Sequence, residues 1–301
     1  MILVIKRSWL RIDGVLLLDK PSGMTSNAAL QAARRLFLAA KAGHTGTLDP
    51  LATGLLPLCF GDATKFSADL LESDKTYEAD LLFGVTTDTG DAEGAILERR
   101  PVNFNRNDLE ALLPRFHGLI RQIPPMYSAL KRNGRPLYEL ARKGIEVERE
   151  AREVSIHELL LLDLDGDRCR LRVSCSKGTY IRTLAEDIGA ALNSGAHLTG
   201  LRRITVGSLN VADALTLEEL HSLSDVERKA CLQPPDALLQ TLPVVHLDAE
   251  STVRFAHGNA VPVSNLPPPG RCRVYGSDGH LLGLADADVT GQVHPRRLVC
   301  A

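Results

Sequence analysis

The sequence lacks the segments that mark membrane and secreted proteins. None of its apolar runs approaches the roughly 20 residues that a helix needs to cross a bilayer. The first 14 residues are apolar and then basic, the reverse of a secretory signal, and no small-residue cleavage site follows. These absences predict a cytoplasmic protein without membrane contact.

Signatures of metals and cofactors are also missing. The six cysteines have no C-x-x-C spacing and the nine histidines have no ligand spacing, so neither a zinc site nor a redox pair is indicated. Most cysteines stand in apolar or alternating runs, which predicts reduced side chains in the interior. There is no G-x-x-x-x-G-K-[ST], no H-E-x-x-H and no G-x-S-x-G. We therefore expect no nucleotide, metal or redox cofactor.

The pattern of apolar residues predicts an α+β fold. The chain has 301 residues, 44% of them hydrophobic, which is enough for one large core and a small appended domain. Alternating or apolar runs predict strands, and apolar residues at helical spacing predict helices. Predicted strands cover residues 15–19, 55–60, 76–84 and 168–175, and predicted helices cover residues 25–43 and 107–116, with another beginning near residue 179. This order favours a mixed, largely antiparallel sheet with flanking helices over a doubly wound parallel sheet.

Composition separates a main domain, which ends near residue 242, from a C-terminal part. From about residue 243 the sequence turns to short β-like pieces joined by turns, which predicts a small β-rich domain over residues 243–301. Within the main domain, residues 86–94 are interpreted as a polar loop. Its acidic residues lack the full spacing of a calcium loop and are interpreted as a solvated turn: Asp88, Asp91 and Glu93.

One loop stands out for its polar content. Residues 43–54 hold three glycines and a proline without a regular period, and Asp49 is followed directly by Pro50. Proline biases the residue before it toward extended backbone and limits its freedom. An isolated Asp-Pro is most often part of a turn. Here His44 and two threonines flank the carboxylate, so both a turn role and a functional role stay open.

The strings around this loop resemble a known family. Residues 43–66, GHTGTLDPLATGLLPLCFGDATKF, are similar to the signature motif of the tRNA pseudouridine-55 synthases, the TruB family. A further similar string precedes this motif at residues 16–26. Others follow it in order at residues 73–91, 122–147, 175–189 and 195–203. Residues 258–263 and 295–299 resemble the family's C-terminal PUA-like module less specifically. The resemblance begins at about residue 13, so it implies a catalytic domain over residues 13–242 and leaves residues 1–12 as an unexplained N-terminal extension.

The resemblance implies the fold, the reaction and its catalytic residues. The family isomerises a uridine in the T-loop of tRNA, detaching uracil from ribose and rejoining it through carbon, without a cofactor. The implied nucleophile is Asp49, and three routes stay open: attack at ribose C1′, attack at the uracil ring, or assistance of elimination at the sugar. The implied partner of Asp49 is Arg182, whose charge should lower the carboxylate pKa. Tyr77 should stack on the base or transfer a proton.

The resemblance also implies how the substrate is bound. A uridine swung out of a folded T-loop loses stacking, and an aromatic platform restores part of it. The implied substrate-binding residues are His44, Tyr180, Leu201 and Lys20, with a structural role for Lys20 equally open. Residues 124–152 hold seven basic and four acidic side chains and resemble the family's loop that closes on RNA.

The whole-chain charge points to localised binding. The formal net charge is −2, which gives no sign of a general nucleic-acid binder. Of the 35 basic residues, 26 are arginine, the side chain best suited to bidentate phosphate contacts. We expect a monomer that binds the T-arm of tRNA through basic charge gathered around Asp49 and residues 124–152. Two other functions remain open: a tRNA-binding chaperone and a hydrolase that releases uracil.

Overall fold

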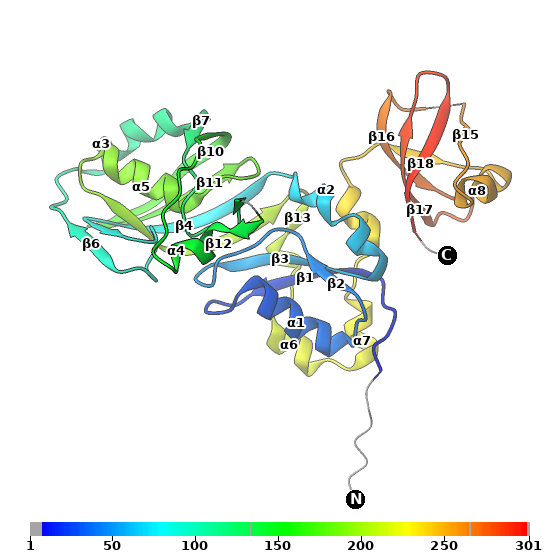
Figure 1. Ribbon diagram of the computed structural model, residues 1–301, viewed down its shortest axis with the longest axis horizontal. Coiled ribbons are helices and arrows are strands. Elements are labelled where there is room, and N and C mark those ends of the chain that lie inside the picture. The colour runs from blue at the N-terminus through cyan, green and yellow to red at the C-terminus, as the bar shows by residue number, and fades with distance from the viewer. Residues whose placement is uncertain (1–7, 133, 265, 300–301) are drawn as a thin grey trace, which may run out of the picture.

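A nine-stranded sheet forms the centre of the protein. The computed structural model describes residues 8–132, 134–264 and 266–299. The strand order is β1-β3-β12-β4-β11-β10-β7, with β2 paired to β3 and β13 paired to β12 (Figure 1). The strands are β1 Gly14–Lys20, β2 Ala42–His44, β3 Thr53–Phe60, β4 Lys75–Phe83, β7 Gly118–Gln122, β10 Arg152–Asp165, β11 Arg168–Cys175, β12 Ala196–Val206 and β13 Leu209–Asn210.

The sheet is antiparallel except at one point. Strands β3 and β12 pair in parallel over two positions, Arg202↔Thr53 and Arg203↔Gly54. Gly54 has φ +97°, and a Cβ there would lie 2.3 Å from the carbonyl oxygen of Arg203, so this close approach requires glycine. The predicted mixed, largely antiparallel sheet is confirmed. The parallel contact joins its two halves and brings β3, β12 and β4 together.

Helices and short hairpins complete the main domain. Short 3₁₀ turns accompany them, such as Leu113–Phe116. The two-stranded hairpins are β5 Val85–Thr87 with β6 Ile96–Arg99, and β8 Lys131–Arg132 with β9 Arg135–Pro136. The helices are α1 Ser26–Phe37, α2 Ser67–Leu71, α3 Arg106–Leu112, α4 Leu137–Ala141, α5 Ile181–Ala191, α6 Leu217–Ser222 and α7 Asp225–Ala230.

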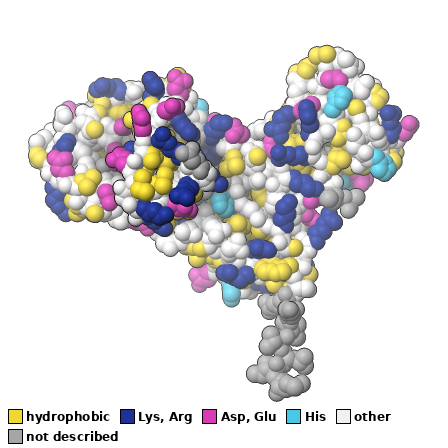
Figure 2. Space-filling view, viewed as in Figure 1, with side chains coloured by type: hydrophobic (Ala, Val, Ile, Leu, Met, Phe, Trp, Pro, Cys, Tyr) yellow, Lys and Arg dark blue, Asp and Glu magenta, His cyan; other side chains and the backbone are white. Residues whose placement is uncertain are grey.

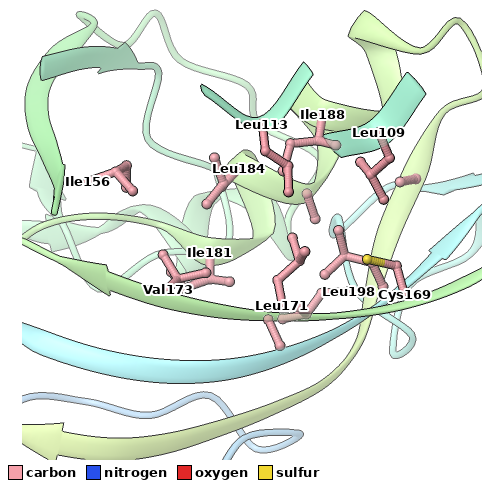
Figure 3. Packing of buried hydrophobic residues seen from close by; sticks show 14 of the residues in the cluster. Leu109, Leu113, Ile156, Cys169, Leu171, Val173, Ile181, Leu184, Ile188 and Leu198 are labelled. Carbon is pink, nitrogen blue, oxygen red and sulfur yellow. The ribbon is translucent and has the colours of Figure 1, made fainter. Parts of the chain in front are cut away.

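Each half of the sheet has its own core. In one half, α5 and α3 pack on β4, β11 and β12, and Figure 3 shows Leu184 and Ile188 of α5 facing Leu109 and Leu113. In the other half, α1 and α6 pack on β1 and β3. Tyr77 and Leu201 pack against both clusters and therefore lie where the two cores meet.

Two predicted boundaries differ from the structure. The first helix was expected to run to Gly43, but α1 ends at Phe37, because Leu38 adopts the left-handed conformation and its N–H bonds to the carbonyls of Arg34 and Arg35. The chain can then turn into β2. The predicted polar loop at residues 86–94 begins as strand β5, which pairs with β6.

The C-terminal domain is a separate five-stranded sheet. Its strands are β14 Val244–His246, β15 Val261–Pro262, β16 Gly270–Tyr275, β17 Leu281–Ala287 and β18 Gln292–Leu298, in the order β14-β16-β17-β18-β15. The predicted β-rich domain is confirmed, although the sequence reading missed helix α8, Ala249–Ala256. Arg271 pairs with Asp69, and Lys65 Nζ donates to the carbonyl of Leu298 at 2.9 Å, which fixes this domain to the main one.

The interior carries free cysteines, as the spacing predicted. In the described part of the chain, four of five cysteines are buried and all five are free: Cys59, Cys169, Cys175, Cys231 and Cys272, of which Cys231 is partly exposed. Cys300 lies outside the described residues. No helix in the described ranges is long and apolar enough to cross a membrane.

Candidate functional site

A cavity of about 240 Å³ opens where the two halves of the sheet meet. Its volume is below the roughly 300–1,000 Å³ of pockets that take drug-sized ligands. The cavity therefore suits a smaller group, such as a single nucleobase. Its walls come from the Asp49 loop, β4, β12, the start of α5 and the segment at residues 128–129. The lining residues are Gly46, Thr47, Leu48, Asp49, Leu71, Lys75, Tyr77, Ser128, Ala129, Ser176, Gly178, Thr179, Tyr180, Ile181, Arg182, Leu201 and Arg203.

Hydrogen bonds from Lys20 and Ser26 hold the loop that carries Asp49. Lys20 is fully buried, and its Nζ donates to the carbonyls of Met24 at 2.6 Å and Pro50 at 3.4 Å. Ser26 Oγ bonds to both backbone groups of Leu48, accepting from N–H at 2.8 Å and donating to the carbonyl at 3.0 Å. These hydrogen bonds therefore fix the loop between β2 and β3, which carries the Asp49 carboxylate.

Arg182 lies between two carboxylates. Its Nη2 is 3.0 Å from Asp49 Oδ2, and its Nη1 is 3.6 Å from Asp91 Oδ2. The Arg182 side chain is 6% exposed, whereas that of Asp49 is 41% exposed and reaches the cavity. The ion pair that the resemblance implied between Asp49 and Arg182 is present, and it leaves part of the carboxylate open to a ligand.

The net shift of the Asp49 pKa is upward. Burial raises the pKa of the Asp49 carboxyl, and this outweighs the effect of Arg182, which lowers it as expected. The nearby carboxylate of Asp91 raises it further. The sequence reading placed Asp91 in a solvated turn and so missed this effect. Asp91 is instead 4% exposed, and its Oδ1 accepts from Thr89 Oγ1 at 2.6 Å.

Two tyrosines share the cavity with the carboxylate. Tyr77 on β4 and Tyr180 just before α5 line the same cavity as Asp49, together with Leu201 on β12. Tyr180 is positioned by Gln122, whose Oε1 accepts from the Tyr180 N–H at 3.0 Å and whose Nε2 donates to the Tyr180 carbonyl at 3.3 Å. Burial raises the pKa of both tyrosine hydroxyls, so both are protonated at neutral pH. Five of the seven predicted site residues thus meet at one cavity.

The other two predicted residues lie outside the cavity lining. Lys20 is buried beneath the Asp49 loop, a position that suits holding the loop, and direct substrate contact stays a prediction. His44 ends β2 and is half-buried, and its Nδ1 is buried without a hydrogen-bond partner. Burial lowers the pKa of the His44 imidazole, and the charge of Arg203 lowers it further. The ring is therefore neutral at pH 7.

A buried cation on the far wall was not predicted. Arg203 is 1% exposed, and its Nε donates to the carbonyl of Leu55 at 2.7 Å. The signal for it was in the sequence: Leu201 and Arg203 are two residues apart on a strand and therefore share a face. Gln122 gave no comparable signal, since its contact with Tyr180 joins residues 58 positions apart.

The segment over residues 124–152 borders the cavity. Its hairpin and helix α4 fold on one another, with the Leu137 N–H bonded to the Leu130 carbonyl at 2.7 Å. The segment also meets the site directly, because Arg182 Nη2 donates to the carbonyl of Tyr127 at 2.6 Å. The position of this segment is thus coupled to the Asp49–Arg182 pair.

Comparison with known proteins identifies the family. The TruB family pseudouridylate synthase N-terminal domain matches residues 34–181, the tRNA pseudouridylate synthase B C-terminal domain matches residues 182–240, and the pseudouridine synthase II TruB C-terminal domain matches residues 243–299. The tRNA pseudouridine synthase B of Dechloromonas aromatica (strain RCB) is 61% identical over 296 residues, covering 98% of each chain. This chain belongs to the TruB family of pseudouridylate synthases. It is an enzyme, an isomerase that forms pseudouridine.

Further relatives agree with this assignment. The tRNA pseudouridine synthase B of Burkholderia lata is 59% identical over 293 residues, covering 96% of this chain and 90% of that protein. Among solved structures, a Cbf5-Nop10-Gar1 complex contains a chain that superposes with a TM-score of 0.72 at 27% identity, covering 92% of this chain and 79% of that one. The fold is therefore that of the pseudouridine synthases. In the residues that the structure describes, no group of three or more His, Cys, Asp or Glu could hold a metal ion.

Proposed function

We propose that this protein converts one uridine in the T-loop of tRNA, at position 55, to pseudouridine, with Asp49 as the nucleophile. The observation that carries the proposal is the half-exposed Asp49 carboxylate, paired with Arg182 at 3.0 Å inside a cavity of nucleobase size. The tRNA pseudouridine synthase B relatives support tRNA as the substrate.

The reaction suits the groups that line the cavity. The bond from uracil N1 to ribose C1′ breaks and a bond from C5 to C1′ forms, while C5 loses a proton and N1 gains one. No electrons enter or leave. A carboxylate can act as the covalent nucleophile for such a step, and the Tyr77 hydroxyl can exchange a proton with the base.

The substrate must leave its stack to reach this cavity. Flipping a uridine out of a folded loop costs a few kcal/mol. Stacking of a base on an aromatic ring returns about 1–3 kcal/mol, and Tyr77 and Tyr180 offer such rings in the cavity that holds the carboxylate. In this proposal His44 and Leu201 contact the flipped nucleotide, and Lys20 supports the loop that faces it.

The surface suits a folded RNA. Figure 2 shows Lys and Arg side chains gathered around residues 124–152 and again on the C-terminal domain, across the hollow between them. This distribution is broader than the single patch expected from the sequence. Folded RNA is recognised mainly through backbone and shape, which both basic areas can serve. We assign residues 13–242 to catalysis, with residues 124–152 closing on RNA, and residues 243–301 to a PUA-like RNA-binding domain.

The proposal is tested by the Asp49→Asn variant. Purified protein is incubated with unmodified tRNA, and pseudouridine is mapped along the RNA. The native protein should modify the T-loop uridine, and Asp49→Asn should lose roughly 10⁴-fold or more in rate, because an amide cannot act as the nucleophile. The matched control is Asp163→Asn, which removes an exposed carboxylate far from the cavity lining and should leave the rate within twofold.

The same experiment separates the alternatives. A chaperone that acts by RNA folding alone would keep its full effect on tRNA refolding in Asp49→Asn and form no pseudouridine in either protein. A hydrolase would release free uracil. Full activity of Asp49→Asn, or pseudouridine at positions outside the T-loop only, would refute the proposal.

A further inference from the structure

Ser128 carries a buried hydroxyl without a hydrogen-bond partner. The residue is 5% exposed, and its Oγ is bonded to nothing within the part of the chain that the structure describes. A buried donor that stays unpaired costs free energy, so interior hydroxyls are nearly always bonded. Ser128 also lines the cavity that holds Asp49. This combination points to a hydroxyl that finds its partner in the ligand.

The backbone around Ser128 is already fully bonded. Its N–H donates to the carbonyl of Met126 at 3.0 Å, and its carbonyl accepts from the N–H of Tyr138 in α4 at 3.1 Å. The preceding carbonyl, that of Tyr127, accepts from Arg182 Nη2 at 2.6 Å. The position of Ser128 is therefore fixed on both sides, and its side chain is the polar group left to bind a ligand.

The surroundings of Ser128 match the edge of a base. Tyr77 and Tyr180 line the same cavity, and aromatic rings stack on the faces of a base. The edge of uracil has two carbonyl oxygens and one N–H, which lose their bonds to water in an enclosed site and need new partners. A serine hydroxyl can donate to the carbonyl oxygens or accept from the N–H. The unpaired hydroxyl on the wall thus complements what the two rings leave unsatisfied.

We propose that Ser128 is a substrate-binding residue: its hydroxyl, unpaired among the described residues of the free protein, forms a hydrogen bond with the edge of the flipped uracil. The inference rests on the proposed function, since it names a further contact to the same substrate. Ser128 is joined to α4 and, through Tyr127, to Arg182. The contact therefore links the base both to the segment over residues 124–152 and to the Asp49–Arg182 pair.

Binding to RNA with and without the target base tests this contact directly. The measurements use the Asp49→Asn background, so that uridine is not converted, and two T-arm hairpin RNAs that differ only in carrying uridine or an abasic site at the target position. Ser128→Ala should raise the Kd of the uridine RNA about fivefold, because one hydrogen bond is lost. The Kd of the abasic RNA should stay within 1.5-fold.

Two outcomes of the binding measurement would overturn the proposal. An equal rise in Kd for both RNAs would show that the Ser128 hydroxyl acts on the segment around it and not on the base. No change for either RNA would show that the hydroxyl contributes nothing to binding.

Tyr180 is the competing partner for this hydroxyl. Burial raises the pKa of the Tyr180 hydroxyl, and Ser128 opposes that rise, so the two side chains are neighbours. No hydrogen bond joins them in the described ranges. The loss of binding caused by Ser128→Ala should therefore persist when Tyr180→Phe is present in both proteins. A loss that disappears there would mean that Ser128 acts through Tyr180, and direct contact with the base would be refuted.

Unfolding of the free protein gives a signature that needs no RNA. Removing an unpaired hydroxyl breaks no bond, so Ser128→Ala should unfold in urea at the native midpoint or above it. The matched control is Ser194→Ala. Ser194 is 1% exposed and lies outside the cavity lining, and its Oγ donates to the carbonyl of Gly195 at 3.1 Å. Ser194→Ala should lower the midpoint and bind both RNAs unchanged.

These measurements separate the base contact from the proposed function. A midpoint lowered as much in Ser128→Ala as in Ser194→Ala would show that the Ser128 hydroxyl is already paired in the free protein, which contradicts the proposal. If the native protein forms no pseudouridine while Ser128→Ala still weakens only the uridine RNA, the proposed function fails and the base contact stands.

Discussion

The two walls of the cavity use buried arginines in opposite ways. On one wall, Arg182 lies between the side chains of Asp49 and Asp91. On the other wall, Arg203 donates to the backbone carbonyls of Leu55 and Gly46, and among the described residues it forms no ion pair with a carboxylate. The first arginine is held by acidic side chains. The second is held by the backbone.

The positive wall extends beyond Arg203. Lys75 lines the same cavity and is buried, with its Nζ donating to the carbonyls of Leu71 at 2.8 Å and of Ser73. Burial lowers the pKa of Lys75 to about 8, and the charge of Arg203 contributes to this shift. Two cations that repel each other thus line the same cavity as Tyr77, whereas the Arg182 wall holds attracting charges. The comparison predicts different responses to substitution on the two walls.

The largest effect is expected from Arg182→Met. The change leaves Asp49 and Asp91 close together without the cation between them, so one of them should take up a proton. Removing one partner of a buried ion pair costs roughly 3–5 kcal/mol, and the exposure of Asp49 places the expected loss near the lower end, about 3 kcal/mol. The measurement is urea unfolding. The rate of pseudouridine formation should fall at least ~10³-fold, since the nucleophile is both displaced and partly protonated.

The conservative variant sharpens this result. Arg182→Lys keeps the charge but has one ammonium in place of a planar fork, so it cannot reach both carboxylates and the Tyr127 carbonyl at once. Its stability should lie between those of the native protein and Arg182→Met. If Arg182→Met were as stable as the native protein, the two carboxylates would not depend on this cation, and the contrast between the walls would fail.

How much of this site could be predicted from the sequence depends on how far apart in the chain the contacting residues lie. The Asp49 loop could be located because its glycines, its proline and its polar residues are contiguous, and the resemblance then supplied Tyr77, Tyr180 and Arg182. Asp91 was misread, since a polar, glycine-containing stretch has the composition of a surface turn. Its burial comes from β12, where Asp91 bridges to Leu198, more than 100 positions away.

The fold shows the same limit. Alternation along single strands predicted most of the sheet, because burial on one face leaves a period of two in the sequence. The end of α1 was misplaced by six residues since no glycine marks it, and Leu38 takes the left-handed conformation instead. The order of the strands depends in part on a parallel contact of two residues between β3 and β12, which has no local signature. The antiparallel pairing of β12 with β4, which places Arg203 opposite Tyr77, likewise joins segments more than 100 positions apart.

A second, smaller effect tests the positive wall through pH. Lys75→Met removes a group whose pKa is about 8 in the folded protein and near 10.5 when unfolded. Between these values the unfolded chain binds more protons than the folded one, so this group makes stability rise with pH. The free energy of unfolding of the native protein minus that of Lys75→Met should therefore increase from pH 7 to pH 10, by no more than about 3 kcal/mol.

Taking this difference removes the other titrating groups. Lys20 is also lowered to about 8 and the buried cysteines are raised, but both proteins share them, so they cancel. Repeating the pair in the Arg203→Met background should shrink the pH dependence, because Arg203 lowers the pKa of Lys75. A difference in the free energy of unfolding that stays flat from pH 7 to pH 10 would mean that folding does not lower the pKa of Lys75.

The smallest effect is expected from Asp91→Asn on the balanced wall. An amide keeps the shape and can still accept from Thr89 Oγ1 and from the Glu93 N–H, but it loses the charge that faces Arg182 at 3.6 Å. That longer contact places the loss near the weak end for a charged hydrogen bond, about tenfold in rate. Because Asp91 raises the pKa of Asp49, its removal should also move the acid limb of the kcat/KM profile to lower pH. A rate loss without that movement would show that Asp91 acts on the position of Arg182 and not on the charge of Asp49, and a movement to higher pH would contradict the arrangement of charges on this wall.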